Sequence, residues 1–180
     1  MSSPLEVSEA YAFCPKCGTK REASTESRPF RCHQCGHTCF FGPVAAVGGI
    51  IRDKQGLVLL LERARDPGRG KLGMPGGFVD PYESAEHALH REVNEEVGIS
   101  IENVQFLMTS PNRYIYQDIL HPVLDVFFVA DACEAHAIAP EEAEVTGWIW
   151  SDLKPDTLAS MAFESNRLAL EVYLRNQRNG

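Results

Sequence analysis

The sequence has no long apolar run. Its apolar stretches, such as 44–51 and 57–61, are far shorter than the roughly 20 residues that a membrane-spanning helix needs. No early apolar segment resembles a signal peptide. We therefore expect a soluble, cytoplasmic protein with no membrane partner.

Basic residues are also scarce. The chain has 17 Lys and Arg against 25 Asp and Glu, a formal net charge of −8 over 180 residues. General binding to nucleic acids or anionic membranes requires clustered Lys and Arg, so this balance argues against both classes. Internal repeats and low-complexity segments are missing too. The length allows one ordinary domain and a small accessory unit.

Cysteine, in contrast, is plentiful near the start of the chain. Four of the six cysteines form two C-x-x-C-G motifs: Cys14, Cys17, Cys32 and Cys35. Without an export signal, this spacing favours a structural Zn²⁺ site over disulfides, because four thiolates complete a tetrahedron around zinc. We expect a zinc ribbon over residues 12–41. Cys39 is then a flanking residue, and Cys133 is expected to be a small packed side chain.

Acidic residues gather in the stretch 77–99, GFVDPYESAEHALHREVNEEVGI. Its apolar residues recur at helical spacing and predict a helix from about Ser84 to Val97, which Gly98 ends. Glu92, Glu95 and Glu96 lie close together on that helix. Such a cluster is commonly a solvated face, since like charges on an exposed helix cost only about 0.2–0.5 kcal/mol.

The complete pattern favours a functional interpretation. It reads G-x5-E-x7-R-E-U-x-E-E-x-G-U, with U aliphatic, and every fixed position is matched. This pattern resembles the signature of the Nudix hydrolase superfamily. The resemblance implies an α/β fold, the Nudix α/β/α sandwich with a mixed sheet, over residues 43–177. Hydrolysis of a pyrophosphate requires Mg²⁺ or Mn²⁺, and such cations prefer carboxylate ligands.

The resemblance also implies roles for individual residues. The metal ligands or the general base would be Glu92, Glu95 and Glu96, with the choice of base left open, and the carbonyl of Gly76 would be a further ligand. Arg91 and Glu83 would form an ion pair that holds the loop against the helix. The sequence departs from many relatives at Tyr82, where they carry glycine.

Substrate contacts are less sharply indicated. The basic, glycine-rich stretch 63–73 offers Arg63 to a phosphate, although solubilising charge is an equal interpretation. Aromatic side chains could stack on an adenine or flavin ring or pack in the core: Tyr114, Tyr116 and Phe163. Glu142 and Glu144 occupy a region where some relatives place another metal ligand or base.

A zinc ribbon before a Nudix domain resembles NADH pyrophosphatases and a shorter class that includes FAD pyrophosphatases. The expected reaction cleaves a nucleoside diphosphate linked to another moiety, with FAD, ADP-ribose or NAD(H) as candidates. Dinucleotide-capped RNA would undergo the same chemistry. The alternative is a non-catalytic nucleotide-sensing module whose ribbon contacts nucleic acid or protein. Family members are often homodimers.

Local patterns predict the remaining elements. The first eleven residues look like a frayed polar tail, and a short helical turn is expected over 151–153. The expected strands cover 44–51, 57–61, 104–109, 123–130 and 145–150. A final helix is expected from about Glu164 to Asn176.

Overall fold

A computed structural model describes residues 4–21, 30–141 and 143–179. The chain divides into two compact units. The first contains residues 1–44 and 113–123, and the second contains residues 45–112 and 124–180. Among the described residues, no helix is long and apolar enough to cross a membrane.

The second unit is built on a sheet. Its strands are β4 (Val44–Arg52), β5 (Val58–Arg63), β6 (Leu72–Gly73), β7 (Ile101–Tyr116), β8 (Ile119–Ala132) and β9 (Val145–Ser151). The order is β8-β4-β5-β6, with β7 beside β8 and β9 antiparallel to β5. The tip of the β7–β8 hairpin, residues 113–123, belongs to the first unit.

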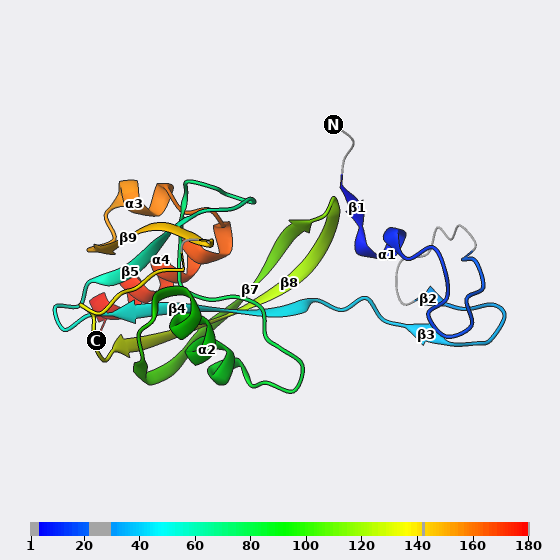
Figure 1. The fold of residues 1–180 in the computed structure, drawn as a ribbon, viewed down its shortest axis with the longest axis horizontal. Helices are drawn as coiled ribbons and strands as arrows, with labels where there is room; N and C mark the ends of the chain where they lie inside the picture. Colours follow the sequence, from blue (N-terminus) through cyan, green and yellow to red (C-terminus); the bar gives the residue numbers. More distant parts are fainter. Residues whose placement is uncertain (1–3, 22–29, 142, 180) are drawn as a thin grey trace. The chain divides into compact units, whose positions relative to one another are not determined.

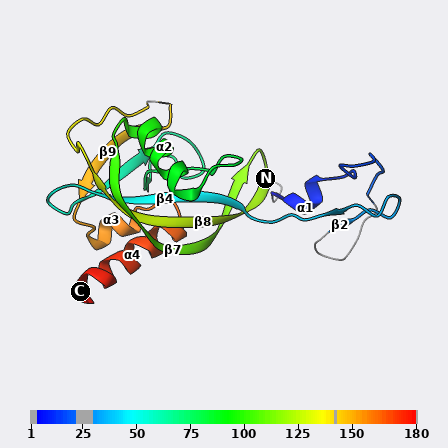
Figure 2. The same cartoon turned by 90° about the horizontal axis from the view of Figure 1, so that it is seen from below.

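Helices cover both faces of this sheet (Figures 1 and 2). One face carries α2 (Ala85–Val97), and the other carries α3 (Pro155–Ala159) and α4 (Glu164–Asn179). Successive side chains of a strand point to opposite faces. Leu59 and Leu61 of β5 accordingly pack in the cluster under α2, and Leu60 packs in the cluster under α4. The α/β/α sandwich expected from the sequence is confirmed.

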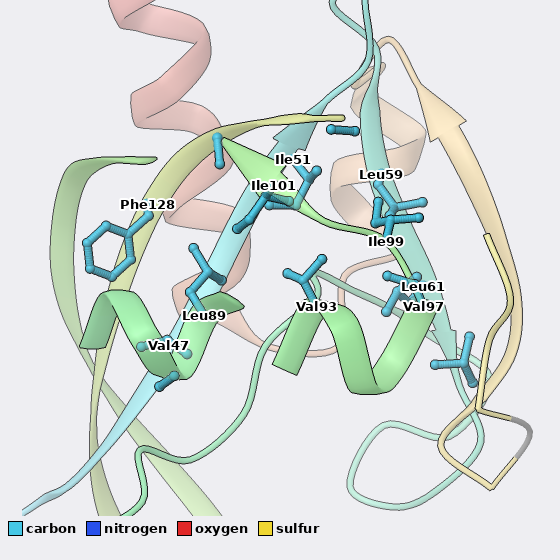
Figure 3. Packing of buried hydrophobic residues seen from close by; sticks show 14 residues of the cluster. Val47, Ile51, Leu59, Leu61, Leu89, Val93, Val97, Ile99, Ile101 and Phe128 are labelled. Atoms are coloured by element: carbon cyan, nitrogen blue, oxygen red, sulfur yellow. The ribbon is translucent and has the colours of Figure 1, made fainter. Parts of the chain in front are cut away.

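The apolar stripe of α2 holds that helix in place. Leu89, Val93 and Val97 are fully buried and point toward the sheet residues Ile51 and Leu59 (Figure 3). Burying one such side chain stabilises the fold by about 1.5–3 kcal/mol. The helix is thus fixed along the side that faces the sheet, and its outer edge is left to carry polar groups.

Capping sets both ends of α2. The Ser84 hydroxyl accepts a hydrogen bond from the His87 amide at 3.2 Å. Gly98 adopts φ 71° and donates its amide to the Asn94 carbonyl at 2.9 Å. Glycine takes this left-handed conformation without a steric penalty. The helix bounds expected from the sequence are confirmed.

The first unit contains β1 (Leu5–Glu6), α1 (Val7–Ala10), β2 (Phe30–Arg31) and β3 (Thr38–Cys39). The sequence-based prediction of a frayed tail is wrong for residues 5–10, and residues 1–3 lie outside the described part of the chain. Leu5 pairs in parallel with Ile119 of β8 and donates its amide to the Asp118 carbonyl at 3.0 Å. Val7 is buried as well. Backbone pairing and this apolar contact order the segment despite its polar composition.

Two further expectations are corrected. Ser151 ends β9 and Leu153 has φ 57°, so the helical turn expected at 151–153 is absent, and α3 begins at Pro155 instead. Proline fits the first turn of a helix, where its missing amide is not needed. Cys133 is exposed rather than packed.

Candidate functional site

Three glutamates on one edge of α2 form what we call the carboxylate ridge: Glu92, Glu95 and Glu96. Their surroundings differ. The Glu92 side chain is only 14% exposed, whereas that of Glu95 is 55% exposed. Glu96 is half-buried, and its carboxyl group accepts a hydrogen bond from the Gly76 amide at 2.8 Å. The ridge therefore runs from solvent into the protein within one helical turn.

Burial changes the acidity of Glu96. Loss of solvent raises its pKa to about 8, and the charges of Glu92 and Glu144 add to the rise. The Gly76 hydrogen bond and the charge of Arg63 oppose it. A carboxyl group with this pKa is largely protonated at neutral pH and ionises when a cation arrives. Burial likewise raises the pKa of Glu92, against the influence of Arg91.

Two glycines let the backbone approach the ridge closely. A Cβ at Gly77 would lie 2.5–2.7 Å from the carboxyl atoms of Glu92. Gly76 has φ 144°, and a Cβ there would lie 2.1 Å from the Val47 carbonyl oxygen. The loop runs beside β4, where Val47 donates its amide to the Gly77 carbonyl at 2.8 Å. Any side chain at either position would displace the ridge or the loop.

Arg91 links the loop to the ridge. Its Nε and Nη2 donate to the two Glu83 oxygens at 3.0 and 2.9 Å, and Nη2 also donates to the Phe78 carbonyl at 3.0 Å. Its Nη1 donates to Glu92 at 2.8 Å and to Glu95 at 3.0 Å. The ion pair expected with Glu83 is present. The two contacts with the ridge were not expected.

A second loop closes the end of α2. Ala139 and Glu141 donate their amides to the carbonyls of Val97 and Glu96, each at 2.9 Å. These bonds satisfy carbonyls that a helix end leaves unpaired. They also bring Glu144 close enough for its charge to raise the pKa values of Glu92 and Glu96. Glu142, the neighbouring candidate, lies outside the described residues.

The residues expected to contact the substrate belong to both units. Arg63 ends β5, its Cζ lies 4.9 Å from the Phe163 ring centroid, and its Nε donates to the Pro67 carbonyl at 2.9 Å. Its charge acts on Glu96. Tyr114 and Tyr116 belong to the hairpin tip in the first unit.

The basic, glycine-rich stretch 63–73 connects two strands. It begins as the last residue of β5 and ends as β6, Leu72–Gly73. Leu72 donates to the Ser160 carbonyl at 3.0 Å, and Ala162 donates to the Leu72 carbonyl at 2.7 Å. Arg65 forms an ion pair with Glu144 at 3.0 Å. Basic residues in this stretch thus have structural contacts as well as positive charge.

The donor chemistry of the ridge fits Mg²⁺ or Mn²⁺. Hard cations take oxygen ligands, and carboxylates crowded within a helical turn repel one another until a cation compensates them. The raised pKa values of Glu92 and Glu96 record that crowding together with burial. Nothing in the ridge requires a softer metal.

The four cysteines of the two C-x-x-C-G motifs also meet. Their sulfur atoms all lie within 4.8 Å of one another, and the pairs Cys14–Cys35 and Cys17–Cys32 are 3.8 and 3.7 Å apart. Zinc–sulfur bonds of about 2.3 Å set tetrahedral edges of about 3.8 Å. All four thiols are free. The cluster is consistent with a zinc ribbon.

The two cysteine motifs have the same local geometry. Cys14 and Cys32 donate their amides to the carbonyls of Thr19 and His37, and each accepts the amide of the glycine four residues on. Both glycines have φ near 70°. Hydrogen bonding with Thr19 lowers the pKa of Cys17 to about 6, which favours the thiolate that zinc binds.

The α/β/α fold and a helix of carboxylates beside a glycine loop are the arrangement that the sequence signature at residues 77–99 implies. The chain belongs to the Nudix family: the family model described as NUDIX domain matches residues 42–166.

Named relatives agree with that assignment. An ADP-ribose pyrophosphatase from Methanocaldococcus jannaschii is 30% identical over 138 residues, which is 76% of each chain. A NAD-capped RNA hydrolase NudC from Haemophilus influenzae (strain PittGG) is 30% identical over 145 residues, 79% of this chain and 52% of that protein. The chain thus spans about half the length of the NudC relatives it matches first.

A solved structure supports the fold. The NUDIX hydrolase from Nitrosomonas europaea superposes with a TM-score of 0.66, covering 93% of both chains at 23% identity. At that identity the likeness concerns the fold.

Several site features were not found from the sequence. The Gly77 approach to Glu92, the Phe78 carbonyl and the loop over the end of α2 all depend on backbone paths. The paired glycines at 76–77 carried a partial signal, since glycine often marks a close backbone approach. The loop amides carry no sequence signal, because any residue but proline supplies one.

Proposed function

We propose that the protein hydrolyses a nucleoside diphosphate linked to another moiety, giving a nucleoside monophosphate and a phosphorylated product. The state of Glu96 is the main support for this proposal. Glu96 is a half-buried carboxyl group, held by the Gly76 amide, whose pKa is raised to about 8 beside Glu92. Perturbed carboxyl groups that converge beside a glycine loop are typical of active sites.

The ridge and the Gly76 carbonyl are the proposed ligands of Mg²⁺ or Mn²⁺. Such a cation neutralises phosphate oxygens and lowers the pKa of water. Arg91 orients Glu92 and Glu95 through Nη1, and Glu83 with the Phe78 carbonyl fixes the guanidinium. The general base is one of the three ridge glutamates, and Glu144 is the proposed additional carboxylate.

The proposed substrate contacts follow from the same geometry. Arg63, stacked on Phe163 and acting on Glu96, is suited to a phosphate near the ridge. Tyr114 and Tyr116 stay proposed base contacts. FAD, ADP-ribose and NAD(H) are the candidate substrates, and the relationship to an ADP-ribose pyrophosphatase supports this group.

The cysteine cluster is the proposed structural Zn²⁺ site. It would form a ribbon over residues 12–41, ahead of a catalytic domain over 43–177. The sulfur spacing of a zinc tetrahedron supports the ligand set. The cytoplasmic location and a homodimer stay predictions.

Dinucleotide-capped RNA is a second candidate substrate. NudC relatives at 30% identity are named for that activity, and the chemistry at the phosphoanhydride is unchanged. The acidic balance of the chain argues against strong contact with the RNA beyond the cap. A purely sensing module is less favoured, because it has no need for three converging carboxylates.

A substrate panel tests the proposal. Purified protein is incubated with FAD, NADH, NAD, ADP-ribose, nucleoside triphosphates and NAD-capped RNA, with Mg²⁺ or Mn²⁺, in ¹⁸O-labelled water. Mass spectrometry should find a nucleoside monophosphate and a partner phosphate, one of them carrying the label. The same panel is run with Glu96→Gln, which should lose cleavage, and with Glu86→Gln, a matched control on the exposed face of α2 that should keep it. Metal binding without cleavage of any compound would favour the sensing module.

A further inference from the structure

Tyr82 has a backbone conformation that its side chain disfavours. Its φ is 68°, in the left-handed region where residues other than glycine pay a steric cost. Among the described residues, four other non-glycine residues share this sign: Asn103, Gln117, Asp118 and Leu153. Asn103 is of a residue type that tolerates the conformation, Gln117 and Asp118 form the two-residue turn between β7 and β8 that requires it, and Leu153 is buried in the cluster under α4. Tyr82 has none of these advantages.

The Tyr82 side chain contributes no packing. Its relative exposed area is 108%, so the whole aromatic ring faces solvent. Large aromatic side chains normally bury most of their surface. Glycine at this position would remove both the backbone strain and the exposed ring. The protein therefore retains a costly residue that does not serve the folded chain itself.

The surrounding loop is held firmly against the ridge. Glu83 donates its amide to the Asp80 carbonyl at 3.1 Å, and its carboxylate accepts the Asp80 amide at 3.1 Å. The same carboxylate binds Arg91, which contacts Glu92 and Glu95. Arg91 also fixes the Phe78 carbonyl at the start of the loop. Tyr82 directly precedes Glu83, so its backbone is anchored next to the group that orients the ridge, while its ring projects into solvent.

We infer that Tyr82 is a substrate-stacking residue, which binds an aromatic ring of the nucleotide whose phosphoanhydride lies at the ridge. A nucleobase offers a flat face to any aromatic side chain, and stacking does not require a particular base. Backbone strain next to a functional site persists where it presents a group to a ligand. The inference rests on the proposed hydrolysis and identifies a further residue that selects ring-bearing substrates.

Three substitutions separate the ring from the strain. Tyr82→Phe keeps the ring, Tyr82→Ala removes it and keeps the left-handed backbone, and Tyr82→Gly removes both. We expect Tyr82→Ala and Tyr82→Gly to raise KM for FAD or NADH roughly 5- to 30-fold, since stacking remote from the reacting atoms mainly affects binding. Tyr82→Phe should keep KM within about twofold of the wild type. Tyr82→Gly should raise Tm above that of Tyr82→Ala.

Binding is also measured without turnover. In a Glu96→Gln background, adding Tyr82→Ala should increase the Kd for NADH by a similar factor. If Tyr82→Ala also lowers the affinity for ADP-ribose, the stacked ring is adenine. If it lowers the affinity only for substrates with a second aromatic ring, such as FAD or NADH, the stacked ring is the flavin or nicotinamide. Equal KM and Kd values for Tyr82→Ala and the wild type would overturn the inference. Absence of turnover in the wild type would instead refute the proposed function.

Discussion

The two compact units of this chain reach order by different means. Among the described residues of the first unit, the buried apolar side chains are few: Val7, Cys14, Cys32, Leu120 and Val123. Two of these are thiols of the cysteine cluster. The second unit has two apolar clusters, one under each helical layer. Under the proposed function, Zn²⁺ would compensate for the small core of the first unit, and the cation of the second unit would serve chemistry.

Charge follows the same division. Residues 1–44 and 113–123 contain six basic and five acidic residues, and the remainder contains eleven basic and twenty acidic residues. The negative charge of the protein thus lies in the unit with the ridge. Such a site attracts cations, and an anionic substrate can approach only once its charge is compensated. The comparison predicts that metal removal has different consequences in the two units.

The largest expected effect is on turnover in Glu96→Gln. We expect a roughly 10²- to 10⁴-fold decrease in kcat, the range associated with loss of a catalytic acid or base group. The fold should persist, because the amide has the shape of the protonated carboxyl group and leaves no cavity. Steady-state kinetics and thermal unfolding measure the two properties. Unchanged kcat would contradict the assignment of the ridge.

Gly77→Ala should have the next largest effect. The new Cβ would clash with the Glu92 carboxyl group, which must then move away from its position beside residue 77 and beside the other two ridge glutamates. A displacement of about 1 Å near reacting groups can cost roughly 10²-fold in rate. Gly42→Ala is the control, since a Cβ there meets nothing within 4 Å. Equal rates for the two variants would show that the position of Glu92 is unimportant.

The pH dependence of metal binding should be smaller. With a pKa of about 8, Glu96 must lose a proton to bind Mg²⁺ or Mn²⁺, so Kd should fall about tenfold per unit of pH between 6 and 8 and level off above. Calorimetry in buffers of different ionisation enthalpy measures the released proton. Glu96→Gln should release none. A Kd independent of pH would contradict the raised pKa.

The same raised pKa predicts a trend in stability. The folded state holds the Glu96 proton more tightly than the unfolded chain, whose ordinary value is 4.5. Without metal, the contribution of Glu96 to the free energy of unfolding should therefore decrease as pH rises from 4.5 to about 8. Denaturant titrations of wild type and Glu96→Gln isolate this contribution. A parallel pH dependence in both proteins would exclude it.

Cys14→Ser should have the smallest effect on turnover and a large local effect. Zinc content should fall from one per chain to near zero, and hydrogen-exchange protection should be lost over the cysteine motifs, because this unit has little core without metal. We expect kcat to change by less than about threefold. Cys39→Ser, outside the cluster, is the control. Retained zinc would refute the ribbon, and lost turnover would show that the units depend on each other.

Local patterns predicted much of the site. Ser84 and Gly98 gave the bounds of α2 because capping depends on neighbouring residues. The cysteine spacing likewise indicated a cluster that the structure brings together. The strand at Leu5–Glu6 was missed, because it forms by pairing with a strand more than 100 residues away. The burial of Glu96 was also missed, since it depends on the backbone path of a neighbouring loop, and many different sequences could follow that path.

The most direct test of the account is a Mn²⁺ titration followed by electron paramagnetic resonance. Wild type, Glu96→Gln and the control Glu86→Gln would be titrated at pH 8 after zinc content is verified. We expect Mn²⁺ to bind wild type and Glu86→Gln with the same affinity and to bind Glu96→Gln at least about tenfold more weakly. Equal Mn²⁺ affinity in all three proteins would contradict the claim that the carboxylate ridge holds the catalytic metal.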